Sequence, residues 1–73
     1  MTVNQIKNTL PIKKDTRDVE CVYMELYDCY ITIESFIGLF GEHELSYNSL
    51  KNADTTRTWK KQFKSWEEQG ILN

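Results

Sequence analysis

Residues 54–72, DTTRTWKKQFKSWEEQGIL, are the stretch on which the predicted fold of this chain depends. Trp59, Phe63 and Trp66 recur at helical spacing and form one apolar stripe, as in an amphipathic helix. The faces that the stripe leaves free carry four basic residues: Arg57, Lys60, Lys61 and Lys64. The spacing therefore predicts a helix that is rooted in the core by aromatic rings and turns a basic face outward.

Both ends of this helix carry capping signals. Asp54 is a typical N-cap residue, because its carboxylate can accept from the backbone N–H groups of Thr56 or Arg57. Gly70 offers the left-handed residue that follows many helices. We therefore expect a helix over residues 55–69, after which the two aliphatic residues that follow Gly70 fold back onto the apolar side or begin a strand.

Two shorter helices are predicted from their end signals. Ser46 can cap a helix over residues 47–53. Residues 2–10 can form another, which Pro11 stops because proline restricts the residue before it and lacks an N–H group. A short extended segment over residues 10–13 is the alternative for the end of this region.

The middle of the chain also shows helical spacing. Its apolar residues step by three and four positions through Val19, Val22, Leu26, Cys29, Ile33, Phe36 and Phe40. This pattern predicts a long helix over residues 16–40, which would be the scaffold of the domain. Two alternatives stay open: residues 29–33, CYITI, have the β-branched and aromatic content of a strand, and Thr32 could cap a separate helix that runs to Phe40.

A second apolar stripe would lie beside the first on this long helix. It consists of Tyr23, Tyr27, Tyr30 and Ile37. One stripe is enough to face the core of so small a domain, and tyrosine presents apolar area at low entropy cost. The second stripe is therefore predicted to be a dimer interface or a surface for another protein. The alternative is a well-covered central helix whose tyrosine hydroxyls reach water.

Charge is distributed unevenly, although the net charge is only −2. Residues 1–17 carry four bases and one acid, which makes residues 1–15 a candidate flexible basic arm; a frayed terminus is the alternative. Residues 18–44 carry seven acids and no base, and residues 45–73 carry five bases and three acids. This pattern predicts a polar molecule with basic ends and an acidic middle.

No catalytic, metal or cofactor site is predicted. His43 and Glu44 begin a string similar to the zinc motif HExxH, but Tyr47 occupies the place of the second histidine. The chain has three glycines and no glycine-rich phosphate loop, and a domain of 73 residues has little room for a cleft. We therefore expect neither an enzyme nor a protein with a small-molecule substrate.

A cytoplasmic protein without a membrane partner is the expected setting. No apolar run approaches the roughly 20 residues that a membrane-spanning helix needs. Two cysteines cannot make a disulfide-dense scaffold, so both are expected to be free thiols in a reducing compartment. The whole chain, residues 1–73, is expected to be one small helical domain.

Residues 45–72 resemble the winged-helix branch of the helix-turn-helix family. In SYNSLKNA, Leu50 and Ala53 match the core positions of the supporting helix. The second helix and its end are matched by Thr58, Trp59, Lys60, Lys61, Phe63, Trp66, Glu67, Glu68, Gly70, Ile71 and Leu72. Two features depart from the family: the turn is short and lacks glycine, and the chain stops at Asn73, before a wing could form.

The resemblance implies a fold and a DNA contact surface. The fold would be mainly α, with three to four helices, a C-terminal helix-turn-helix and no complete wing. The implied DNA contacts are Thr55, Thr56, Arg57, Lys60, Lys61 and Lys64, with Tyr47 and Asn48 in reach of phosphate. Thr56 and Arg57 would read sequence, and the lysines would anchor phosphates.

Two functions follow from these patterns. The first is a small helix-turn-helix DNA-binding regulator, or a replication or transcription accessory protein, that acts as a dimer. The second belongs to another class: a small protein of the phage or mobile-element type that binds a host protein and inhibits or adapts it. In that case the acidic, tyrosine-rich middle of the chain would be the interface.

Overall fold

One helix precedes three consecutive strands, and helices alone follow. A computed structural model describes residues 1–73. In chain order its elements are α1 (Val3–Thr9), β1 (Ile12–Lys14), β2 (Glu20–Met24), β3 (Cys29–Thr32), α2 (Ile33–Phe40), α3 (Tyr47–Leu50) and α4 (Arg57–Glu68). The prediction of a mainly α domain is therefore wrong: the fold is mixed, with a three-stranded antiparallel sheet.

The predicted long helix over residues 16–40 is replaced by a β-hairpin and a short helix. Side chains on β2 alternate between two faces, with Val22 and Met24 buried and Tyr23 partly exposed between them. Asp18 and Asp28 adopt positive φ values of 62° and 49°, the left-handed conformation that aspartate tolerates in tight turns. The helical spacing was misleading here because the two turns interrupt the segment and divide its apolar residues between two strands and a helix.

Both alternatives for this region are confirmed. Residues 29–32 form β3, and α2 begins directly after it at Ile33. The Thr32 hydroxyl caps α2 by accepting from the backbone N–H of Ser35 at 3.1 Å. One threonine thus ends the strand and starts the helix.

The sheet has the order β1-β2-β3 and divides its side chains between a core face and an outer face. Ile12, Val22 and Ile31 pair across the three strands and face the core. Tyr23 pairs with Tyr30 on the opposite face. Most of the candidate basic arm is regular structure, because α1 precedes β1 and β1 pairs with β2.

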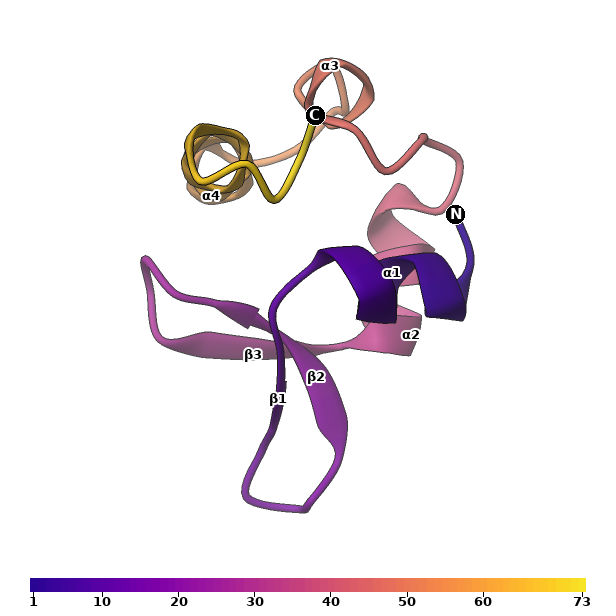
Figure 1. The fold of residues 1–73 in the computed structure, drawn as a ribbon, viewed down its shortest axis with the longest axis vertical. Helices are drawn as coiled ribbons and strands as arrows, with labels where there is room; N and C mark the ends of the chain where they lie inside the picture. Colours follow the sequence, from indigo (N-terminus) through magenta and orange to yellow (C-terminus); the bar gives the residue numbers. More distant parts are fainter.

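The predicted N-terminal helix is confirmed as α1. Thr2 and Gln5 form a capping box, in which the Thr2 hydroxyl accepts from the Gln5 backbone N–H at 3.2 Å and the Gln5 side chain accepts from the Thr2 N–H at 2.8 Å. The helix ends before Pro11, as expected. Figure 1 shows α1 and α2 on one side of the molecule and α3 and α4 above the sheet.

The core is one aromatic-rich cluster that joins both halves of the chain. It contains Ile6, Leu10, Val22, Ile33, Phe36, Phe40, Leu50, Ala53, Phe63, Trp66 and Leu72. Trp59 packs at its edge, with ring centroids 5.6 Å from Phe36 and 5.1 Å from Phe40. The predicted aromatic root of the last helix is therefore confirmed.

The ends of α4 follow the prediction only in part. The expected cap by Asp54 is wrong: the N-cap residue is Thr56, its side chain makes no capping hydrogen bond, and the helix begins at Arg57. At the other end Gly70 has φ 77°, as its glycine predicted. The chain then folds back, and the N–H groups of residues 71 and 72 donate to the Trp66 carbonyl at 2.9 and 3.2 Å.

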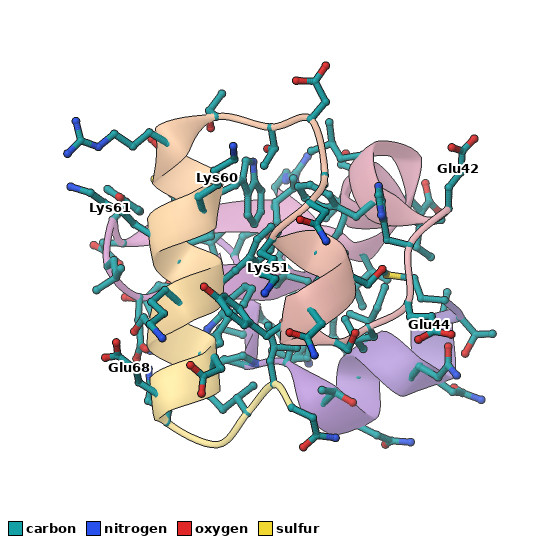
Figure 2. The ribbon with its side chains drawn as sticks, turned by 90° about the horizontal axis from the view of Figure 1, so that it is seen from above. Glu42, Glu44, Lys51, Lys60, Lys61 and Glu68 are labelled. Atoms are coloured by element: carbon teal, nitrogen blue, oxygen red, sulfur yellow. The ribbon has the colours of Figure 1, made fainter.

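The helix before α4 is shorter than predicted. The Ser46 hydroxyl accepts from the Ser49 backbone N–H at 3.3 Å, as its role of cap required. However, α3 ends at Leu50, and residues 51–56 form turns and a connecting loop rather than helix. Figure 1 shows α3 and α4 end-on and Figure 2 shows them side by side. No helix of the molecule is both long and apolar enough to cross a bilayer.

Candidate nucleic-acid interface

The exposed side of α4 is predominantly basic. Because Phe63 and Trp66 face the core, helical geometry places positions 57, 60, 61 and 64 on the opposite side. All four basic residues at these positions are exposed: Arg57, Lys60, Lys61 and Lys64. Figure 2 shows Lys60 on the side of α4 nearer α3 and Lys61 on the other side. The sequence placed these four residues correctly, since a single helix fixes their spacing.

A fifth cation, which the sequence did not predict, comes from the end of α3. Lys51 is exposed, and Figure 2 shows it between α3 and α4. Its Nζ lies 5.6 Å from the centroid of the Tyr47 ring, and Lys64 Nζ lies 5.3 Å from the same centroid. The spacing of four positions between Tyr47 and Lys51 was the signal available in the sequence. We call the set Lys51, Arg57, Lys60, Lys61 and Lys64 the α3–α4 basic surface.

Most cations of this surface have no carboxylate partner. Lys64 alone forms an ion pair, with Glu67 Oε1 at 2.9 Å, and the hydrogen bond that its ammonium donates to that carboxylate raises the pKa of Lys64. The other four form no ion pair within the chain. Their charges are therefore available to an external anion.

The cations of the first seventeen residues are in the opposite situation. Three ion pairs neutralise them: Lys7 with Glu20 at 3.5 Å, Lys14 with Asp18 at 3.4 Å, and Arg17 with Asp15 at 2.7 Å. The remaining one, Lys13, lies over the ring of Tyr23 at 4.1 Å. These positive charges, which suggested a basic arm, are paired at the surface with acids or with an aromatic ring of the same chain.

Asp15 shows how strongly this end of the molecule is organised. Its carboxylate accepts from the Arg17 guanidinium and from the backbone N–H groups of Arg17 and Val19. The Arg17 side-chain hydrogen bonds contribute most, and together these donors lower the pKa of Asp15 to about 2. The neighbouring thiol of Cys21 is buried, and burial raises its pKa.

The other predicted DNA contacts lie around the basic surface. Thr56 and Asn48 are exposed, whereas Thr55 and Tyr47 are partly buried. Tyr47 is joined to the basic surface by its contacts with the two lysines. The structure thus brings Tyr47 together with Lys64, and leaves Thr56 exposed at the start of α4 beside Arg57.

The predicted stripe of Tyr23, Tyr27, Tyr30 and Ile37 does not exist as one helical face. Tyr23 and Tyr30 are cross-strand partners with ring centroids 5.1 Å apart, Tyr27 lies in the turn between β2 and β3, and Ile37 packs against the core from α2. The Tyr23 hydroxyl donates to Asp28 Oδ1 at 2.7 Å, which raises the pKa of Tyr23 to about 12.

The side of the molecule away from α4 is acidic. Glu42 and Glu44 are exposed, and Figure 2 shows them on the other side of the molecule from Lys61. With His43 and Met1 they line an open hollow of about 530 Å³. The chain nowhere gathers three side chains of the types that bind metal ions. Glu42 and Glu44 thus lie away from the α3–α4 basic surface, whereas Glu68 is an exposed acid on α4 itself.

Comparison with known proteins adds no family to this picture. No protein-family model matches the chain, and no curated protein or solved structure is significantly similar to it. The resemblance of residues 45–72 to winged-helix proteins therefore stays a prediction from the sequence pattern. The function of this chain has to be inferred from the placement of its own side chains.

Proposed function

We propose that this protein binds nucleic acid, and DNA in particular, through the α3–α4 basic surface, as a small regulatory or accessory protein. One observation carries this proposal: five of the nine cations share one side of the molecule, and four of the five have no carboxylate partner. The only other cation without a carboxylate partner, Lys13, lies over the Tyr23 ring. Phosphate groups are the abundant ligands of such a surface.

The cations differ in what they can contribute. Lysine acts on phosphate as a point charge, whereas the planar guanidinium of Arg57 can donate two parallel hydrogen bonds to a phosphate or to a guanine edge. Five phosphate contacts correspond to a slope of about −4.5 in log affinity against log salt. Such a slope weakens binding on the order of 500-fold between 50 and 200 mM salt.

The acidic side of the molecule supports the same assignment. The net charge of the chain is −2, so attraction to DNA has to come from local charge and from orientation. Glu42 and Glu44 lie away from α4 and are repelled by a polyanion. The field of the protein therefore turns the basic surface toward the nucleic acid during the encounter.

The test is a pair of charge reversals with equal net charge. Lys60→Glu with Lys61→Glu removes two unpaired cations, and the control, Lys7→Glu with Lys14→Glu, removes two that are already paired. Fluorescence anisotropy with a labelled duplex should show a loss of at least about tenfold for the first variant and a loss several times smaller for the control. Circular dichroism should show that both variants are folded.

Two outcomes would contradict the proposal. Equal losses for both variants would mean that only net charge matters and that the basic surface is not a site. A wild-type affinity that does not change with salt would exclude phosphate contacts as the source of binding.

A second function, binding to another protein, is favoured by a different observation. The β2–β3 hairpin exposes large apolar side chains: Leu26 is 51% exposed, Tyr30 45% and Tyr27 37%. Aromatic side chains of this kind are enriched in protein interfaces. Under this proposal Tyr30→Ala would abolish function in a folded protein, whereas the reversal of Lys60 and Lys61 would leave function intact.

A further inference from the structure

Two ammonium groups from different helices approach one aromatic ring where α3 meets α4. Lys51 Nζ and Lys64 Nζ lie 5.6 and 5.3 Å from the centroid of the Tyr47 ring. The two nitrogens are therefore at most 10.9 Å apart, the sum of these two distances. We call Tyr47, Lys51 and Lys64 the Tyr47 cluster. It is the one place where cations of both helices of the basic surface meet.

The ring at the centre of the cluster is held firmly. Tyr47 packs against the core beside the fully buried Leu50, and its backbone N–H donates to the Asn73 carbonyl at 2.9 Å. Lys64 is held by Glu67 at 2.9 Å, whereas Lys51 has no carboxylate partner. The ring is thus a fixed support between two exposed lysines, of which Lys51 is free to take an anion and Lys64 can share it.

The aromatic rings of the chain do not line the basic surface, where a single-stranded nucleic acid would stack its bases. Proteins that bind single strands stack the bases on exposed rings beside a basic groove. Here the rings of α4 point into the core, and Trp59 is packed against Phe36 and Phe40. Tyr23 and Tyr30 lie on the sheet face turned away from the core, and Tyr27 lies in the turn between their strands. The ring of Tyr47 itself is approached by two ammonium groups.

A convex basic helix without exposed rings suits a ligand that presents phosphates and keeps its bases stacked. We propose that the nucleic acid is a DNA duplex and that the Tyr47 cluster anchors one of its backbone phosphates between α3 and α4. This inference rests on the proposed function and adds the form of the ligand and the anchoring point. Lys60, Lys61 and Arg57 then follow the strand along α4 from that point. The grip is on the backbone, since phosphate contacts position a protein without reading sequence.

The ligand form is tested with two probes on the wild-type protein. Anisotropy is measured with a labelled DNA duplex of about 20 base pairs and with one of its strands alone, each at low and moderate salt. The duplex should bind on the order of tenfold tighter than the single strand. A single strand needs exposed rings on which to stack its bases, and the α3–α4 basic surface offers no such ring. Equal or tighter binding of the single strand would overturn the duplex assignment.

The anchoring point is tested with a double-mutant cycle. Lys51→Ala and Lys64→Ala should each weaken duplex binding on the order of fivefold, and the double variant should lose clearly less than the product of the two losses, since both ammonium groups hold one phosphate. The matched control is Lys14→Ala, whose ammonium is paired with Asp18 at 3.4 Å. Losses that multiply independently, or a loss in the control of the same size, would overturn the shared anchor.

These outcomes separate the inference from the function on which it rests. If neither probe binds the wild-type protein, the proposed function fails. If both probes bind and the reversal of Lys60 and Lys61 abolishes binding, the function stands. In that case a preference for the single strand, or a multiplicative cycle, overturns only the inference about the duplex and its anchor.

Discussion

The two ends of the molecule carry similar numbers of cations and use them in opposite ways. Residues 1–17, which form α1, β1 and the turn that follows, have four cations. Three of them form ion pairs with carboxylates at 3.5, 3.4 and 2.7 Å. The α3–α4 basic surface has five, of which one is paired. Isolated ion pairs at a protein surface contribute little to stability, so the pairing matters mainly for which charges remain available.

The difference shows that the number of cations in a segment does not tell how many of them are available to bind an anion. Strand pairing places Lys7, on the helix before the sheet, near Glu20, which is 13 residues away in the sequence. On α4 the outward positions carry four bases, and of the two acids at the end of the helix only Glu67 forms an ion pair, with Lys64. Carboxylates brought close by the β1–β2 hairpin pair with the first group of cations, and most of the second group has no carboxylate within reach.

The largest effect on stability is expected from truncating a core residue that anchors α4. Trp66 is fully buried, so Trp66→Ala should lower the free energy of unfolding by about 3–5 kcal/mol and thereby dismantle the surface. The same truncation on the hairpin, Leu26→Ala, removes a side chain that is 51% exposed and should change the free energy of unfolding by less than about 0.5 kcal/mol. Urea denaturation followed by circular dichroism measures both. Similar losses would mean that the hairpin, and not α4, is rooted in the core.

The next effect concerns the residue that ends α4. Gly70 has φ 77°, and Gly70→Ala should cost about 1–2 kcal/mol because a side chain destabilises the left-handed conformation. Gly38 lies inside α2 with open space around its Cα, so Gly38→Ala should stabilise the protein by about 0.5–1 kcal/mol. The opposite signs, read from thermal or urea unfolding, make each variant the control of the other. A gain in stability for Gly70→Ala would contradict the left-handed conformation.

A smaller effect should appear when the paired cations are released. Asp18→Asn with Glu20→Gln frees Lys14 and Lys7 without changing the basic surface. The affinity for a DNA duplex should rise, and the salt slope should become steeper by about 0.9 for each new phosphate contact. Glu42→Gln with Glu44→Gln changes the net charge equally on the acidic side and should have a weaker effect. Equal gains for both pairs would show that pairing is irrelevant and only total charge counts.

The smallest effect is the loss of one carboxylate, and it depends on pH. The pKa of Asp15 is about 2 in the folded protein, below its ordinary value of 3.8, so its stabilising contribution is complete above about pH 3.8 and is lost as the pH falls toward 2. Asp15→Asn should therefore destabilise the protein at neutral pH, and its difference from the wild type should shrink between these two values. Asn48→Ala removes no ionisable group and should give a difference that is constant with pH. A constant difference for Asp15→Asn would contradict the depressed pKa.

Helices with clear end signals could be predicted from the sequence. Pro11, Thr32, Ser46 and Gly70 each act through their own backbone or side chain, so their effects do not depend on distant residues. Asp54 is the exception, since its cap position was taken by Thr56 without a side-chain hydrogen bond. Local chemistry fixes that a helix begins nearby, and tertiary packing decides at which residue.

The sheet could not be predicted from the same reasoning. The apolar residues of β2 and β3 fit a helical period and show no clear alternation over so short a span. The hairpin turns use Asp18 and Asp28 in place of the glycine or asparagine that marks most tight turns. The pairing of β2 with β1 and β3 stabilises strands in place of a helix, and no local sequence pattern contains this pairing.

The candidate site was predictable in the part that one helix determines. Helical spacing fixed the side of α4 on which Lys60, Lys61 and Lys64 lie. Lys51 was missed because it joins them only through the packing of α3 on α4, around Tyr47. The neutralisation of Lys7 by Glu20 was missed for the same reason, since it depends on contacts between distant segments.

The bracing of α4 has a consequence for the thermodynamics of binding. The hairpin tip contacts the helix through the Leu26 N–H, which donates to Gln62 Oε1 at 3.1 Å, and through Glu25, which accepts from Gln69 Nε2. The chain end is tied to the Trp66 carbonyl. A helix fixed at so many points does not need to fold on its ligand, so association should bury little new apolar surface. Calorimetry should therefore give a heat-capacity change near zero, the signature of a preformed polar surface in which only lysine side chains lose freedom.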